Sequence, residues 1–223
     1  VDDHRRGPAQ DPDHPRDLHG LPEPGGEREH RLLQLRAAGV EVCPKHFPGH
    51  GDTDSDSHLS LPVINHDYHR MDSLEMYPFK KLIEGGVGSI MAAHLFIPAL
   101  DSTPKMPTSL SRKVVTGLLK EQLGFKGLVF SDALNMKGAA GAGEPGKVCL
   151  MAFLAGNDVL LFADDIPKSI ELIKKALNEG QITKAEFERA NEHMQDLQTR
   201  FANVSVQTID LTLSFEPLEA ALP

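Results

Sequence analysis

The chain has 223 residues, 40% of them hydrophobic, and a formal net charge of −9, a composition typical of a globular protein with an apolar core. The negative charge disfavours non-specific nucleic-acid binding, and no run of about 18 apolar residues is present to span a membrane. The polar start, VDDHRRGPAQ, does not have the pattern of a signal peptide. Two cysteines are too few for a disulfide framework, and we expect Cys43 and Cys149 to be buried free thiols.

The first 30 residues contain five prolines, four glycines and few apolar side chains. Such a segment cannot bury enough surface to offset the entropy of ordering it. We therefore expect an irregular or disordered segment over residues 1–34, with the change in composition near Arg31. Residues 35–202 form the predicted folded domain, and the weakly patterned residues 203–223 form a tail or linker.

Four short apolar runs then recur without polar alternation, the pattern of strands buried on both faces of a parallel sheet. Helix signals lie between and after them, with a proline or serine at the start and a glycine just past the end. Thr183 and Glu186 have the spacing of a capping box. The predicted strands are Val40–Cys43, Val87–Ala92, Gly127–Phe130 and Asp158–Phe162, and the predicted helices are Pro78–Glu84, Arg112–Leu123, Pro145–Ala155, Pro167–Glu179 and a last one from Thr183 to about Phe201.

This alternation of strands and helices predicts an α/β fold with right-handed crossovers. A (β/α)8 TIM barrel uses about 250 residues, or roughly 31 per unit. Residues 40–180 therefore hold about four βα units, which would make a partial barrel. An open four-stranded sheet is the competing architecture.

Polar side chains follow three of the predicted strands, where parallel α/β folds place their reactive groups. Lys45 and His46 follow the first strand, His94 follows the second and Asp132 the third. For Asp132 taken alone, a helix N-cap or turn residue is the structural alternative. Such side chains at three consecutive strand ends favour a functional site.

The first of these loops, KHFPGHGDTDSDSH (residues 45–58), holds three histidines, three aspartates and a lysine. Its run of alternating aspartates starts like an EF-hand, but Ser57 and Val63 stand where that loop needs glycine and glutamate. His46 and His50 have the spacing of a helical zinc pair, but a proline and two glycines forbid a helix there. A non-helical metal site and a solvated turn remain open.

Proton transfer explains the loop better. Asp56 and His58 are two residues apart, so in an extended segment their side chains point to the same side. An aspartate beside a histidine orients the ring and stabilises the imidazolium, which makes His58 a candidate general acid/base. Asp132, at a neighbouring strand end, suits a carboxylate nucleophile. A nucleophilic carboxylate with an acid/base on another loop is the arrangement of a retaining glycosidase.

These residues resemble a known family. The segments KHFPGHGDT…DSH…LP (45–62), FSDALNM (130–136) and AGNDVLLF (155–162) are similar to the β-N-acetylhexosaminidase branch of glycoside hydrolase family 3. The resemblance covers roughly residues 35–201. It implies a (β/α)8 barrel that removes terminal N-acetyl-β-D-glucosamine with retention of configuration, and we expect neither a cofactor nor a metal.

The resemblance also implies roles for individual residues. In that branch the nucleophile is the aspartate of the SD motif, here Asp132, and the acid/base is the histidine of DSH, here His58, with Asp56 as its partner. The residues expected to contact the sugar are Lys45, His46, His94 and Met136. In Gram-negative bacteria such enzymes act on cell-wall fragments during peptidoglycan recycling, so the expected partner is a small carbohydrate. The cytoplasm and the periplasm are both open as compartments.

Upstream of the KHFPGHG motif the sequence departs from the family, which has four further βα units there and an aspartate and an arginine that bind sugar hydroxyls. Residues 1–34 show neither, and we hypothesise that residues 1–30 are a truncated or out-of-frame region. Half a barrel has open sheet edges and an incomplete sugar-binding wall, so we expect low activity or none. The competing functions are hydrolysis of other β-glycosides and a non-catalytic fragment.

Overall fold

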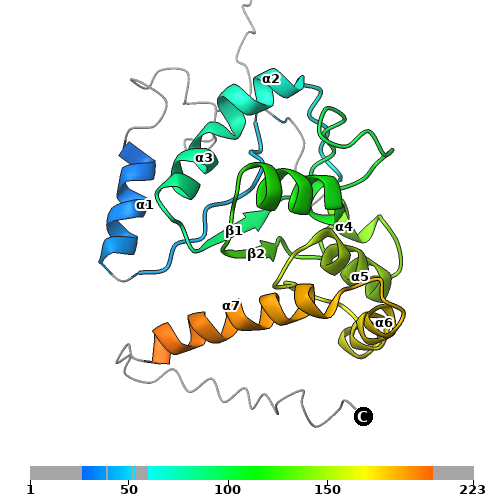
Figure 1. Cartoon of the computed structure of the whole chain (residues 1–223). Coiled ribbons are helices and arrows are strands. Elements are labelled where there is room, and N and C mark those ends of the chain that lie inside the picture. Colours follow the sequence, from blue (N-terminus) through cyan, green and yellow to red (C-terminus); the bar gives the residue numbers. More distant parts are fainter. Residues whose placement is uncertain (1–26, 39, 52, 54–59, 203–223) are drawn as a thin grey trace, which may run out of the picture.

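The computed structural model describes residues 27–38, 40–51, 53 and 60–202 (Figure 1). In this part of the chain, helices surround a small parallel sheet of two strands, β1 (Ser89–Ala92) and β2 (Leu128–Ser131). Its helices are α1 (Glu27–Ala37), α2 (Tyr68–Arg70), η2 (Met71–Glu75), α3 (Tyr77–Glu84), η3 (Thr108–Leu110), η4 (Lys113–Gln122), α4 (Lys137–Ala140), α5 (Pro145–Ala155), α6 (Ile166–Asn178) and α7 (Lys184–Ala202). Most of segment 1–34 and the whole of the tail, residues 203–223, lie outside the described residues.

The sheet places four chain segments side by side. Strands β1 and β2 pair in parallel along their whole length. Single parallel bridges extend the sheet on both sides, from Phe47 to Ala92 of β1 and from Val159 to Phe130 of β2. Because these segments run in the same direction, their C-terminal ends meet at one edge, the edge that carries reactive groups in parallel α/β folds.

Two of the four predicted strands are confirmed as β1 and β2, within two residues of the predicted ends. The strand predicted over Val40–Cys43 is wrong: the first backbone hydrogen bond from β1 to this segment reaches the Pro44 carbonyl oxygen, and the bridge to β1 forms at Phe47. Pro44 and Pro48 have no N–H group to donate, which limits the ladder that this edge segment can form. The fourth predicted strand, Asp158–Phe162, contributes one bridge.

The predicted helices are confirmed as α3, η4, α5, α6 and α7. Helix α5 ends at Ala155, and the next residue, Gly156, has a φ of 110°, the left-handed conformation that glycine adopts just past helix ends. The predicted capping box before α7 is present: the Glu186 carboxylate accepts a hydrogen bond from the Thr183 N–H (2.9 Å), and the Thr183 hydroxyl accepts one from the Glu186 N–H (3.2 Å).

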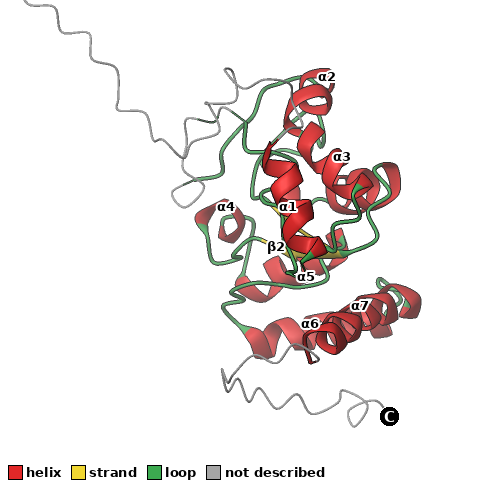
Figure 2. Cartoon of the chain, turned by 90° about the vertical axis from the view of Figure 1, so that its left-hand side faces the viewer, coloured by secondary structure: helices red, strands yellow, loops and turns green. Residues whose placement is uncertain are grey.

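Two helices differ from expectation. Helix η4 is a wide π-type helix, in which the Leu123 N–H donates to the Leu118 carbonyl oxygen at 2.9 Å, five residues back. Helix α1 begins at Glu27, so regular structure starts a few residues before the expected boundary near Arg31. Figure 1 shows α3 on the β1 side of the sheet and α7 on the β2 side, and Figure 2 shows α6 and α7 together, away from α1 and α3.

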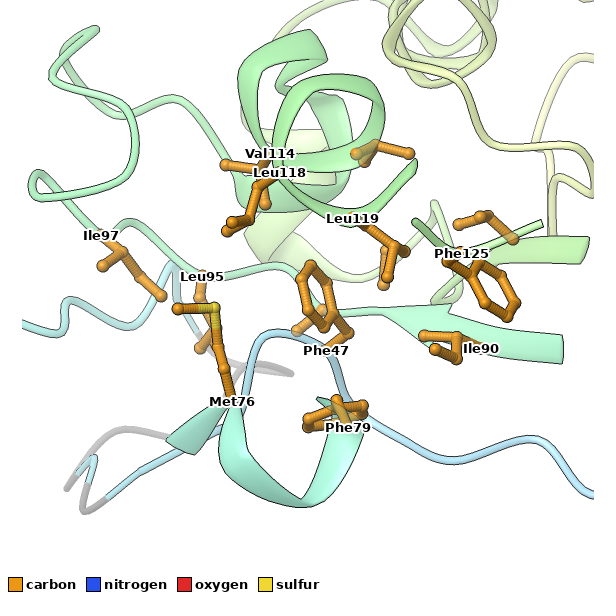
Figure 3. Packing of buried hydrophobic residues seen from close by; sticks show 14 of the residues in the cluster. Phe47, Met76, Phe79, Ile90, Leu95, Ile97, Val114, Leu118, Leu119 and Phe125 are labelled. Atoms are coloured by element: carbon orange, nitrogen blue, oxygen red, sulfur yellow. The ribbon is translucent and has the colours of Figure 1, made fainter. Parts of the chain in front are cut away.

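The main apolar core lies between the sheet, α3 and η4 (Figure 3). Phe47 is fully buried and packs edge-on against Phe79 of α3, with ring centroids 5.4 Å apart. Ile90 of β1 and Leu119 of η4 are also fully buried. Phe47 directly follows His46, so the core holds one end of the histidine-rich loop. A second, smaller apolar cluster consists of Leu110, Leu134, Ala139, Val148, Cys149 and Ala152.

The two cysteines are free, but only Cys149 is buried as expected. The prediction for Cys43 is wrong: this residue is exposed, because its neighbours Val42 and Pro44 are buried and Cys43 points to the opposite side of the extended segment. Within the described part of the chain, no helix combines the length and the apolar character needed to cross a bilayer.

Replacing Ile90 by alanine should destabilise the protein far more than the same change at Ile170. The Ile90 side chain is fully buried in the sheet, so its truncation should lower the free energy of unfolding by about 2–5 kcal/mol. Ile170 on α6 is 48% exposed, and its truncation should change that free energy by less than about 0.5 kcal/mol. Urea unfolding of the two variants measures both effects, and equal losses would contradict the described core.

Candidate active site

Three of the predicted site residues come together at the C-terminal edge of the sheet. His46, His94 and Asp132 are supplied by the segment before Phe47, the residues after β1 and the residue after β2. The His46 Nε2 atom lies 3.5 Å from Asp132 Oδ2, and the two side chains are 28% and 18% exposed. A substrate can therefore reach both groups from solvent.

Asp132 is held by its own backbone and by that of the next residue. The Asp132 N–H donates to the Ala92 carbonyl oxygen at 3.0 Å, which continues the pairing of β1 and β2 beyond the last paired residue. The Ala133 N–H donates to Asp132 Oδ1 at 2.8 Å. The N-cap alternative is excluded, because the next helix, α4, has Met136 as its N-cap residue. One carboxylate oxygen is thus oriented by the backbone, and the other faces His46.

The glycines of the PGHG turn allow close packing around His46. Gly49 has a φ of 117°, and a Cβ atom at this position would lie 2.7 Å from the Glu75 Cβ atom. Only glycine fits such a position without displacing backbone. Glu75 is itself buried and forms an ion pair with Arg70 at 3.0 Å. The turn is therefore seated on the end of η2, and two cis peptide bonds, Lys45–His46 and Phe47–Pro48, precede it.

The environment of His46 favours its neutral form. Burial lowers the pKa of His46 below its ordinary value, and the positive charge of Lys45 adds to this lowering. The carboxylate of Asp132 acts in the opposite direction without reversing the net effect. At neutral pH the ring is therefore uncharged and has one donor and one acceptor for hydroxyl groups.

His94 has a different setting, because its side chain is buried with 1% exposure. Its Nδ1 atom lies 2.6 Å from the Ser109 hydroxyl oxygen, and its Nε2 atom lies 3.0 Å from the Ala133 carbonyl oxygen. Burial lowers the pKa of this ring as well, although its hydrogen bond to Ala133 and the charge of Asp132 oppose the shift. Both ring nitrogens are thus engaged with protein atoms.

The other predicted site residues are less well defined. Lys45 is exposed next to His46, and Met136 is buried with 8% exposure four residues after Asp132. Asp56 and His58 lie outside the described residues. Among the residues that the structure describes, no group of three or more histidine, cysteine or acidic side chains is arranged to hold a metal ion.

Sequence reasoning missed Ser109 and Asn157, which are buried polar residues behind His94. The Asn157 amide donates to the Ser109 carbonyl oxygen at 2.7 Å and to the Ala152 carbonyl oxygen at 2.6 Å. Their positions in the chain are 48 residues apart, so no local pattern links them. The one available signal in the sequence is the polar pair Asn157–Asp158, which directly precedes an apolar run in AGNDVLLF.

A cavity of about 260 Å³ lies away from this edge, between η4 and α7. Gly127, just before β2, is one of its lining residues, which places the cavity near the N-terminal end of that strand. Its other lining residues are Arg112, Thr116, Lys120, Glu121, Phe125, Lys126, Glu186 and Arg189. Neither His46 nor Asp132 lines it, so it is not the site that these residues form.

Residues 31–197 match the Glycosyl hydrolase family 3 N terminal domain. The chain belongs to glycoside hydrolase family 3. The β-hexosaminidases of Nitrosospira multiformis and Methylobacillus flagellatus are each 36% identical to it, over 164 and 159 residues. These regions are 73% and 71% of this chain but 46% and 45% of the relatives, so the chain spans about half the length of these family 3 relatives.

Solved structures of family 3 enzymes have the same fold. A glycoside hydrolase family 3 β-N-acetylglucosaminidase from Paenibacillus sp. matches with a TM-score of 0.73 and 32% identity, over 83% of this chain and 36% of that chain. The β-N-acetylglucosaminidase from Thermotoga maritima matches with a TM-score of 0.66 and 30% identity, over 75% and 37%. The fold is therefore that of the barrel-like N-terminal domain of family 3, and the residues described here form a part of it with a small parallel sheet.

Removing the charge of Asp132 should lower the pKa of His46 further. The carboxylate raises that pKa, so in Asp132→Asn the ring should become protonated only at a more acidic pH than in the wild type. NMR titration of the His46 ring measures the change. Asp72→Asn is the matched control, because Asp72 pairs with Lys80 and should leave His46 unaffected. A His46 pKa that stays constant or rises in Asp132→Asn would contradict the described pair.

Proposed function

We propose that this chain carries the catalytic nucleophile, the acid/base and part of the sugar-binding site of a retaining β-N-acetylglucosaminidase. The observation that carries the proposal is the geometry of Asp132, whose carboxylate is oriented by the Ala133 N–H at the C-terminal end of β2 and faces His46 across 3.5 Å. Family membership and relatives that are β-hexosaminidases support it. The proposed architecture is a partial (β/α)8 barrel of about four βα units.

In the proposed reaction, Asp132 Oδ2 attacks the anomeric carbon of the terminal sugar. The bond from this carbon to the leaving oxygen breaks, and a glycosyl ester forms on the aspartate. His58, held by Asp56, donates a proton to the leaving oxygen. It then removes a proton from the water molecule that hydrolyses the ester, so configuration is retained. The roles of Asp56 and His58 rest on the family resemblance.

His46 and Lys45 are proposed to bind the hydroxyl groups of the sugar beside the nucleophile. A neutral His46 can donate one hydrogen bond and accept another, and the Lys45 ammonium can only donate. His46 also lies close enough to Asp132 to fix the sugar relative to the attacking oxygen. Met136 is proposed to line the same subsite. The proposed substrates are β-N-acetylglucosaminides, among them peptidoglycan fragments.

A non-catalytic fragment is the second candidate, and the coverage of the relatives favours it. The matched region is 46% of the β-hexosaminidase of Nitrosospira multiformis, so more than half of that relative lies outside the match. Turnover of chromogenic N-acetyl-β-D-glucosaminide by this chain distinguishes the two candidates. Equal turnover of the matching glucoside would instead point to another β-glycosidase activity.

Asp132→Asn should lower turnover of the chromogenic N-acetylglucosaminide by about 1,000-fold or more, because an amide cannot form the glycosyl ester. Asp72→Asn provides the control, since it makes the same chemical change at a residue that pairs with Lys80 and not with His46. It should retain wild-type turnover. Full activity in Asp132→Asn would eliminate this residue as the nucleophile.

His58→Ala should slow natural substrates by about 100-fold or more but aryl substrates with good leaving groups much less, because such leaving groups need little protonation. Rates for a series of aryl N-acetylglucosaminides with leaving groups of increasing pKa measure the effect. Equal losses across the whole series would rule out His58 as the general acid.

A further inference from the structure

A buried polar network links the proposed nucleophile loop to the interior of the domain. From it we infer that His94 is a positioning residue, which holds Ala133, and through it the Asp132 carboxylate, in the attacking geometry. This inference rests on the proposed role of Asp132. It goes beyond that role by assigning His94 a function that it performs through Ala133, without contact with the sugar.

The hydrogen bonds of His94 define a single tautomer. Its Nε2 atom faces the Ala133 carbonyl oxygen at 3.0 Å, and a carbonyl can only accept, so Nε2 carries the proton. Burial keeps the ring neutral by lowering its pKa, and Nδ1 is then an acceptor. The Ser109 hydroxyl, 2.6 Å from Nδ1, must therefore be the donor in that contact.

Ser109 is fixed on its other side by backbone and side-chain contacts. Its N–H donates to the Ala93 carbonyl oxygen at 3.0 Å, which ties η3 to the chain just before His94. Its carbonyl oxygen accepts from the Asn157 amide at 2.7 Å. Ser109 and Asn157 are 0% and 2% exposed, so water does not compete for these bonds. The hydroxyl that donates to His94 Nδ1 is therefore held in place.

Ala133 transmits this constraint to the nucleophile. Its carbonyl oxygen accepts from His94 Nε2 and from the Met136 N–H, both at 3.0 Å, while its N–H donates to Asp132 Oδ1 at 2.8 Å. Loss of the His94 donor would leave the Ala133 carbonyl oxygen with the Met136 N–H alone. It would thereby loosen Ala133, whose N–H orients the Asp132 carboxylate. Misplacement of a reacting group by about 1 Å costs about 100-fold in rate.

His94 has no ring nitrogen left for the substrate. Both are occupied by protein atoms within 3.0 Å, and the side chain is 1% exposed. A sugar hydroxyl could bind His94 only by displacing Ser109 or Ala133. The contacts therefore support a role in holding the loop over direct recognition of the sugar.

The test compares the full-length chain with His94→Gln, His94→Asn and His94→Leu. Glutamine can place its amide nitrogen near the position of Nε2 and so donate to the Ala133 carbonyl oxygen. Asparagine places its amide nitrogen only near the position of Nδ1, and leucine has no donor. The readouts are ¹⁵N NMR of the His94 ring, hydrogen exchange of the Ala133 amide, and kcat and KM for the chromogenic N-acetylglucosaminide. Leu118→Ala, in the core helix η4, controls for general loss of stability.

At neutral pH the wild-type ring should be uncharged and should carry its proton on Nε2. His94→Leu and His94→Asn should increase exchange of the Ala133 amide by about 10-fold or more and lower kcat by about 100-fold with little change in KM. His94→Gln should keep most of both properties. Leu118→Ala should leave the ring tautomer and the Ala133 amide unchanged.

A proton on Nδ1, or unchanged Ala133 exchange in both His94→Leu and His94→Asn, overturns the inference. A rise in KM alone, without a fall in kcat, overturns it in favour of direct sugar binding. If the wild type turns over no substrate, the proposed function fails, and the ring and amide measurements still decide whether His94 holds the loop. If His94→Leu does not fold, His94→Asn provides the same comparison.

Discussion

The hydrogen bond from the Asp132 N–H to the Ala92 carbonyl oxygen is the contact on which the site depends. It carries the parallel pairing of β1 and β2 one residue beyond the sheet and thereby delivers a carboxylate to the edge where His46 arrives from the neighbouring segment. A slip of one residue in this register would exchange Asp132 for Ser131, which is fully buried, and would turn the carboxylate to the other face of the sheet.

The side chain of Asp158 fastens β2 near its start, and the backbone of Asp132 fastens it just after its end. Near the start of the strand, Asp158 accepts hydrogen bonds from the Val129 N–H at 2.7 Å and from the Lys120 ammonium at 2.9 Å. Both members of this ion pair are largely buried, so loss of one partner would leave an uncompensated charge. After the last residue of β2, Asp132 is bound to Ala92 and Ala133 but keeps one oxygen toward His46. Both carboxylate oxygens of Asp158 therefore accept hydrogen bonds within the fold, whereas Asp132 Oδ2 faces His46 at the exposed edge of the sheet.

Local patterns in the sequence predicted those parts of the fold that local physics determines. Proline at a helix start, glycine at a helix end and the Thr183–Glu186 capping box predicted helices that the structure contains. The strand over Val40–Cys43 could not be placed in this way, because pairing depends on which neighbour the segment meets and on two prolines that shorten its ladder. Likewise, the sequence put His94 at a strand end but could not reveal that Ser109 and Ala133 occupy its ring nitrogens, because those residues are 15 and 39 positions away.

We propose that Asp132 forms a covalent bond to the sugar. It connects the geometry of the β1–β2 edge, membership of glycoside hydrolase family 3 and the proposed holding role of His94. The most direct test is mass spectrometry of the chain after incubation with a fluorinated N-acetylglucosamine analogue that slows hydrolysis of the glycosyl ester. We predict one sugar adduct per chain, located by peptide mapping on Asp132. An adduct on any other residue would contradict the assignment.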